Sequence, residues 1–224
     1  MTDTNKLLIP AVPHFPAGGN EYTSRYQNEL NNVIRLYLDR LNGALQSLSA
    51  PPTGGQFLSF PHIAASYTGS QYATATDTPT LVAWNTDEGS AGFTLSATEA
   101  TADITGVYKI TYSLQFVNTD NAIHNATVWL RVNGVDVPRS TTVFTIPARK
   151  SVGNPSYVCG YSEVVFPISG GDYIQLYWAT GKAYSTTGPV DGVYIIAEPA
   201  QTSPYAHPSV PSAIGSITFI SGTL

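Results

Sequence analysis

The side chains that most often carry out catalysis or hold metals are few and scattered in this sequence. Asp87 and Glu88 are adjacent in a turn, where their carboxylates point apart, so they do not form an acid and base pair. Motifs of serine hydrolases, phosphate-binding loops and cysteine–histidine catalysts are missing. The histidines lack the short spacing of metal ligands: His14, His62, His124 and His207. The sequence predicts no enzymatic activity, no catalytic residue, no metal site and no cofactor.

Tyrosine is the residue type that offers binding chemistry. The chain contains 14 tyrosines, and each ring combines an apolar face, suited to stacking on a sugar, with a hydroxyl that forms hydrogen bonds. Those at alternating strand positions are expected to fill the core or a contact between subunits. Those nearer to loops are the candidates for contact with a glycan: Tyr67, Tyr72, Tyr157, Tyr161 and Tyr184.

The elements that must position these side chains are mostly β-strands. Residues 106–117 read GVYKITYSLQFV, a period of two that is typical of a strand with one buried face. Residues 170–179 and 192–198 repeat the pattern after a glycine turn, and Asn133-Gly134 predicts a tight hairpin. Many short strands separated by turns predict an all-β fold, an antiparallel jelly-roll sandwich over residues 57–198.

One amphipathic helix is expected over residues 20–48. Its apolar residues recur at spacings of three and four, and Asn20 is a suitable N-cap. This stripe is close to a coiled-coil seam, so self-association with copies of the chain and packing on its own β-domain are both open. In the first case the stripe contributes to a trimer interface through Tyr26, Leu30, Val33, Tyr37 and Leu41.

Extended segments flank the helix and the sandwich. Residues 1–19 form an apolar N-terminal arm that proline and glycine keep out of helices, and residues 49–56 form a linker. Residues 199–224 form a C-terminal arm whose last strand is expected to add to the sheet of a neighbouring subunit. Both arms are expected to anchor the protein to a capsid or a neighbour, through these residues: Leu7, Leu8, Ile9, Val12, Phe15, Ile217, Phe219 and Ile220.

Composition narrows the classes of partner. Charged residues make up 11% of the chain, against about 25% in ordinary soluble domains. The net charge is −5 and Lys and Arg do not cluster, so no nucleic acid partner is expected. The apolar start is too short for a signal or membrane segment, so no membrane partner is expected either. A single cysteine excludes an intramolecular disulfide.

The segment Thr80–Glu198 resembles the C1q/TNF-like jelly roll. Its motifs occur in family order: TLVAWNT, GFTLSATEATADITGVYKITYSLQF, VWLRVNGVDV, GYSEVVFPISGGDYIQLYW and DGVYIIAE. The resemblance implies a tight trimer about a three-fold axis, with Tyr108, Tyr112 and Tyr194 at the subunit contact. Some family members bind calcium. This sequence has no dense cluster of acidic residues, so no calcium site is expected here.

The flanking parts are similar to structural proteins of tailed bacteriophages. The similarity lies in the apolar, proline-containing lead, the helix ending LDRLNG and the PSVPSAI tail. It implies a homotrimeric capsid decoration or cement protein on the outer surface of a virion, made in the host cytoplasm. Its partner would be the major capsid protein or another virion protein. The alternative is a fibre or tail protein that recognises host surface glycans.

Overall fold

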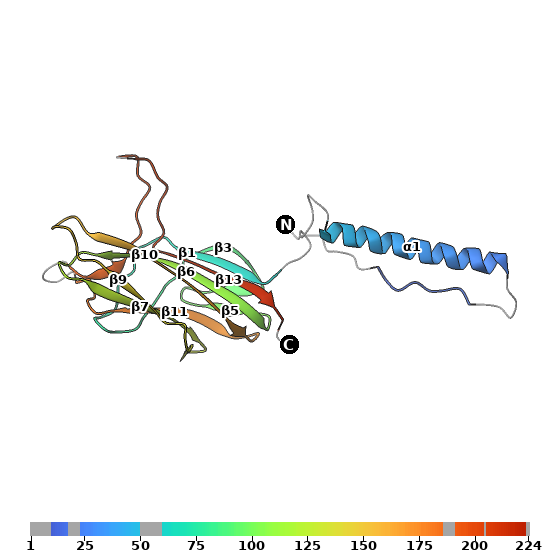
Figure 1. Ribbon diagram of the computed structural model, residues 1–224, viewed down its shortest axis with the longest axis horizontal. Helices are drawn as coiled ribbons and strands as arrows, with labels where there is room; N and C mark the ends of the chain where they lie inside the picture. Colours follow the sequence, from blue (N-terminus) through green and yellow to red (C-terminus); the bar gives the residue numbers. More distant parts are fainter. Residues whose placement is uncertain (1–9, 18–22, 50–59, 186–190, 204, 223–224) are drawn as a thin grey trace. The chain divides into compact units, whose positions relative to one another are not determined.

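The computed structural model describes residues 10–17, 23–49, 60–185, 191–203 and 205–222. The chain divides into two units, Met1–Ser59 and Phe60–Leu224, which are treated separately. The first contains helix α1 (Ser24–Ser49), and the strands that the structure describes lie in the second (Figure 1). Within the described residues, no helix has the length and apolar character needed to cross a membrane.

Helix α1 starts and ends later than expected. The Thr23 hydroxyl accepts a hydrogen bond of 3.2 Å from the backbone N–H of Tyr26, so Thr23 is the N-cap in place of Asn20. The helix also continues through Asn42-Gly43 to Ser49. A glycine costs about 1 kcal/mol relative to alanine inside a helix, and the good helix formers around Gly43 offset this.

One sheet, sheet A, holds the strand with the clearest alternation. Its order is β10-β6-β13-β1-β3, and β12 also pairs with β6. The bounds are β1 (His62–Tyr67), β3 (Thr86–Ala91), β6 (Gly106–Asn118), β10 (Ser156–Ile168), β12 (Val193–Ile195) and β13 (Ala213–Ser221).

The second sheet, sheet B, closes the sandwich. Its order is β4-β5-β11-β7-β8, with β2 paired to β11 and β9 to β7. The bounds are β2 (Thr80–Leu81), β4 (Phe93–Leu95), β5 (Ala100–Ala102), β7 (His124–Val132), β8 (Val135–Asp136), β9 (Thr142–Ile146) and β11 (Tyr173–Thr180). The pairings are antiparallel in both sheets, and β6, β7, β10 and β11 alternate between the sheets, which confirms the all-β jelly-roll sandwich. Asn133 and Gly134 adopt positive φ angles of 51° and 78°, as the predicted hairpin requires.

The inner face of β6 lies at the centre of the core. Tyr108, Ile110, Tyr112, Leu114 and Phe116 are all buried against residues from both sheets. The prediction that Tyr108 and Tyr112 contact sister chains is therefore wrong, because their rings are already covered by their own chain. An alternating pattern shows which residues share a face of a strand, but not what covers that face.

The C-terminal strand is the largest departure from expectation. β13 pairs with β6 on one side and with β1 on the other, so it lies inside sheet A of its own chain. Ile217 is buried and Phe219 packs on the core, while Ile220 is exposed. The predicted addition of this strand to a neighbour is wrong, as is the boundary of the sandwich at residue 198.

The connection between β12 and β13 explains how the strand returns. Bridges between Glu198 and Val210 and between Gln201 and His207 fold this segment back on itself. It projects beyond the sheets as the brown-red loop in Figure 1. The proline-rich stretch is therefore a protruding loop that connects β12 to β13 within sheet A.

Candidate functional site

Three tyrosine rings from separate segments gather at one end of sheet A. The ring centroid of Tyr194, on β12, lies 5.1 Å from that of Tyr72 and 4.7 Å from that of Tyr184. Tyr72 and Tyr184 are 5.5 Å apart, so every ring contacts the other two. These separations are those of favourable aromatic pairs. Together with Tyr157 and Glu198, described next, these residues are called the tyrosine cluster.

The strand register places Tyr157 beside these rings. Tyr157 and Tyr194 are the register partners of Val117 on opposite sides of β6. Residues directly opposite in a sheet share a face, so both rings lie over the outer face of sheet A with Val117 between them. Val117 is fully buried although it points outward, as expected if the tyrosines cover it. The cluster is thus an aromatic surface built over a valine.

Glu198 contributes the charge of the cluster. Burial, followed by the nearby Glu198 carboxylate and its hydrogen bond, raises the pKa of Tyr157. Burial and the other tyrosines raise the pKa of Tyr194 to about 12. Both hydroxyls therefore stay protonated at neutral pH and can act as hydrogen-bond donors.

A buried glutamine positions Tyr72. The Gln71 side chain accepts a 2.7 Å hydrogen bond from the Ala83 backbone N–H and donates one of 3.2 Å to the Ser212 hydroxyl. Its backbone pairs with Ile195, next to Tyr194. Since Gln71 is fixed on three sides, Tyr72 is held against β12 by the core of the sandwich.

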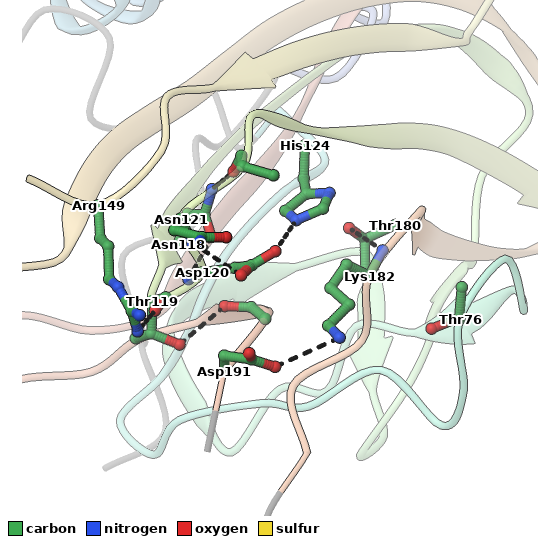
Figure 2. A network of polar contacts seen from close by, with 12 residues as sticks. Thr76, Asn118, Thr119, Asp120, Asn121, His124, Arg149, Thr180, Lys182 and Asp191 are labelled. Atoms are coloured by element: carbon green, nitrogen blue, oxygen red, sulfur yellow. Dashed lines mark hydrogen bonds and ion pairs between the residues drawn. The ribbon is translucent and has the colours of Figure 1, made fainter. Parts of the chain in front are cut away.

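Tyr184 is held by a closed loop. An ion pair of 3.3 Å joins Lys182 to Asp191 across the loop that carries Tyr184 (Figure 2). The Tyr184 backbone N–H donates to the carbonyl of Val193, and the Val193 N–H donates to the carbonyl of Lys182. The two sides of the loop are thereby tied together next to Tyr194.

A second set of polar contacts ties this loop to the end of β6. Thr119 donates to the carbonyl of Gly192 through both its backbone N–H and its hydroxyl, at 3.0 and 3.1 Å. Arg149 donates to the carbonyl of Thr119 at 2.6 Å. His124 Nε2 donates to the Asp120 carboxylate at 2.6 Å, with both side chains largely buried (Figure 2). The sequence indicated only that His124 lacks the spacing of a metal ligand, and its contact with Asp120, four residues earlier in the chain, was not predicted.

The Asp120–His124 contact makes a testable contribution to stability. The hydrogen bond from His124 holds the pKa of Asp120 below its ordinary value of 3.8. A lowered folded-state pKa stabilises the fold above the unfolded pKa, and this contribution disappears as the pH falls through the folded value. Asp120→Asn is expected to lower the free energy of unfolding at neutral pH by about 1–2 kcal/mol and to flatten its decline in acid. Denaturant titrations at neutral and acidic pH measure both effects. Asp39→Asn, at an exposed position on α1, is the control, and an unchanged acid dependence in Asp120→Asn would contradict the assignment.

Three of the five tyrosines predicted to contact glycan meet in this cluster, namely Tyr72, Tyr157 and Tyr184. Tyr67 packs against the core, and Tyr161 is exposed on β10 next to Glu163. Tyr194 belongs to the cluster as well, and its predicted place at a trimer interface stays a prediction. Whether any of these rings contacts a glycan stays a prediction.

The other predicted site residues lie apart from the cluster. Tyr26, Leu30, Val33, Tyr37 and Leu41 form one partly buried stripe on α1. Val12 and Phe15 are exposed, while Leu7, Leu8 and Ile9 lie outside the described residues. Among the described side chains, no three His, Cys, Asp or Glu residues gather as a metal site would require.

Comparisons with known proteins find likeness among solved structures only. No family model matches the sequence, and no curated protein matches it. Among solved structures, the chain is similar to the globular domain of zebrafish complement 1qA protein, at 12% identity and a TM-score of 0.41. The match covers 74% of this chain and 100% of that one. The assignment of the sandwich rests on the strand pairing of this chain itself.

Proposed function

We propose that this protein is a non-enzymatic structural protein of a bacteriophage virion, a trimer that decorates and stabilises the head shell. The N-terminal unit attaches to the major capsid protein or another virion protein, and the jelly roll faces outward. Three arms acting together give firm attachment from individually weak contacts. The observation that carries the proposal is the apolar face of α1.

The apolar face of α1 is wider than its partly buried stripe. Next to that stripe, on the same side of the helix, Ile34 and Leu38 remain exposed, by 38% and 54%. The opposite side carries polar and charged residues, including the Arg25–Glu29 ion pair. An amphipathic helix with large apolar residues in water gains free energy by packing against copies of itself. This favours helix association over a solitary helix.

The outer face of sheet A offers a second contact between subunits. Because Tyr108 and Tyr112 are buried in the core, a sister chain that contacts sheet A would meet its other face. That face exposes Tyr161 and Val165 on β10 and Ile214 on β13. Between them lie the small polar residues of β6, such as Thr111 and Ser113, so a neighbour can approach closely. An exposed apolar patch of this kind is typical of an interaction surface.

Attachment to the shell depends on the N-terminal arm. Val12 and Phe15 are exposed large apolar residues within it. Of the C-terminal anchoring residues, Ile217 and Phe219 are committed to the core and only Ile220 remains exposed. We therefore expect deletion of residues 1–19 to abolish binding to virion shells lacking the protein, measured by co-sedimentation. Unchanged binding by the shortened chain would refute attachment through this arm.

Charge on the helix face should disrupt the trimer. The double variant Ile34→Asp, Leu38→Asp is expected to sediment as a monomer at micromolar concentration, where the wild type is a trimer, since it places carboxylates in the helix contact. Leu36→Asp is the matched control: Leu36 is 45% exposed but lies on the opposite side of α1. A monomeric wild type, or equal dissociation of the Leu36 variant, would contradict the proposal.

A second candidate function is recognition of host surface glycans by the jelly roll, as in a fibre or tail protein. The tyrosine cluster favours it, because the fold brings together aromatic rings that the core does not need. Binding of the full chain to a glycan array supports recognition, while loss of shell binding on deletion of residues 1–19 supports decoration. The two readouts are independent, since the arm and the cluster belong to different units.

A further inference from the structure

We propose that the tyrosine cluster binds a neutral pyranose unit of a glycan, with Tyr72 and Tyr157 stacking on the sugar and Glu198 accepting hydrogen bonds from its hydroxyls. This inference rests on the second candidate function and specifies its site and ligand class. Four properties of the cluster carry it.

The first property is that two of the four tyrosine rings are exposed to solvent, while the other two lie behind them and are partly buried. Tyr72 and Tyr157 are 52% and 56% exposed, whereas Tyr184 and Tyr194 are partly buried between or beneath other groups. Tyr72 is nearly parallel to Tyr194, with an interplanar angle of 26°, and its exposure shows that this stacking leaves ring surface accessible to a ligand. An exposed aromatic face backed by another ring offers a firm apolar surface of the size of one sugar ring.

The second property is that the rings are fixed before any ligand arrives. Gln71 holds Tyr72 through buried hydrogen bonds, and the Lys182–Asp191 ion pair closes the loop that carries Tyr184. Thr119 ties the same loop to β6 through Gly192. A ligand therefore does not have to order these side chains, which lowers the entropic cost of binding.

The third property is the presence of a carboxylate beside the rings. Glu198 follows β12 in the segment whose Ile196 N–H donates to the Gln115 carbonyl of β6, and its carboxylate helps to raise the pKa of both Tyr157 and Tyr194. A carboxylate has several acceptor sites, so Glu198 can accept from sugar hydroxyls as well. Tyrosine hydroxyls in the protonated state supply donors. Apolar faces with a few placed polar groups are what a saccharide requires.

The fourth property, local charge, selects among saccharides. Two cations on the elements beside the cluster have partners within the chain: Lys182 pairs with Asp191, and Arg149 donates to the Thr119 carbonyl. Glu198 repels carboxylated or sulfated sugars, and the whole chain carries a net charge of −5. The cluster therefore suits neutral sugars.

The test measures saccharide binding by the full chain with calorimetry. The probes are maltohexaose, cellohexaose and a neutral galactose oligosaccharide, with a heparin hexasaccharide as the anionic probe. We expect at least one neutral probe to bind and the heparin probe not to bind. Tyr72→Ala and Tyr157→Ala should each weaken that binding about tenfold or more, the loss typical of truncating a central aromatic contact. Tyr72→Phe should retain most of the binding, because it keeps the stacking face.

Phe60→Ala is the matched control. Phe60 is an aromatic residue of the same unit that is 54% exposed, and it lies just before β1, outside the cluster and outside the proposed contact between subunits. Melting curves establish that each variant is folded. The proposal is overturned if no neutral probe binds, if the Phe60 variant loses as much affinity as the Tyr157 variant, or if the cluster variants dissociate the trimer in sedimentation. If the cluster variants still bind a neutral saccharide, this site is refuted, but recognition of glycans elsewhere on the chain is not. Helix association and shell binding are tested by separate experiments.

Discussion

A chain that ends at Val210 is expected not to fold its sandwich. Removing β13 takes away the strand between β6 and β1, and leaves both with unpaired backbone N–H and C=O groups. It also removes the buried Ile217 and the Phe219 ring, which packs edge-on against Tyr108 at 5.5 Å. These losses together exceed the typical 5–15 kcal/mol stability of a domain, at an order-of-magnitude level. Circular dichroism and thermal melting of the shortened chain would show the absence of a cooperative transition.

Two controls make this result specific to β13. A chain ending at Ser221 lacks residues 222–224 only, and should melt like the wild type. Ile217→Asp keeps the full length but places a carboxylate in the core, and should destabilise the fold by about 3 kcal/mol or more. If the chain ending at Val210 kept a cooperative melt, β13 would not be needed for the sandwich of its own chain, and its pairing with β1 and β6 would not explain the stability of the fold.

Trp178→Ala has the second largest expected effect. Trp178 is fully buried on β11, where its ring lies 6.0 Å from that of Phe116 on the opposite sheet. Replacing a buried aromatic residue by alanine typically costs about 3–5 kcal/mol, since apolar burial is lost and a cavity is left. Equilibrium denaturation of the variant should show this loss as a lower midpoint with a similar slope.

A smaller substitution separates the packing of Trp178 from its polar atom. Within the described part of the chain, the buried Nε1 of Trp178 has no hydrogen-bond partner. Trp178→Phe removes this group and keeps most of the ring, so its cost should stay below about 1.5 kcal/mol. Equal destabilisation by Phe and Ala would contradict the packing argument.

The fold class and several turns follow from the sequence for local physical reasons. The alternation in β6 requires one buried face, and Asn133-Gly134 favours the positive φ angles of a tight turn. These signals depend only on neighbours along the chain. The N-cap of α1 was misplaced by three residues, since Asn20 and Thr23 are both suitable capping residues and the sequence does not rank them.

Pairing over long distances in the chain is what the sequence could not reveal. β13 follows a proline-rich segment, and nothing in that segment shows that bridges such as Glu198–Val210 fold it back. The tyrosine cluster depends in the same way on the pairing of Gln71 with Ile195, which are far apart in the chain. The tyrosines could be recognised in the sequence as residues able to stack on a ligand. That they come together on one surface follows from the register of the sheet, which the sequence does not show.

The position of β13 also sets the time at which the sandwich can form during synthesis. β1 and β13 are neighbours in sheet A, yet β13 is made after every other strand. At about 5–20 residues per second, the ribosome needs several seconds or more between completing β1 and completing β13. Until β13 is made, β1 and, once it has been synthesised, β6 each have an unpaired edge, and such edges pair readily with other chains. The nascent protein is therefore most prone to mispairing on the polysome, where copies of the same unfinished sheet lie close together.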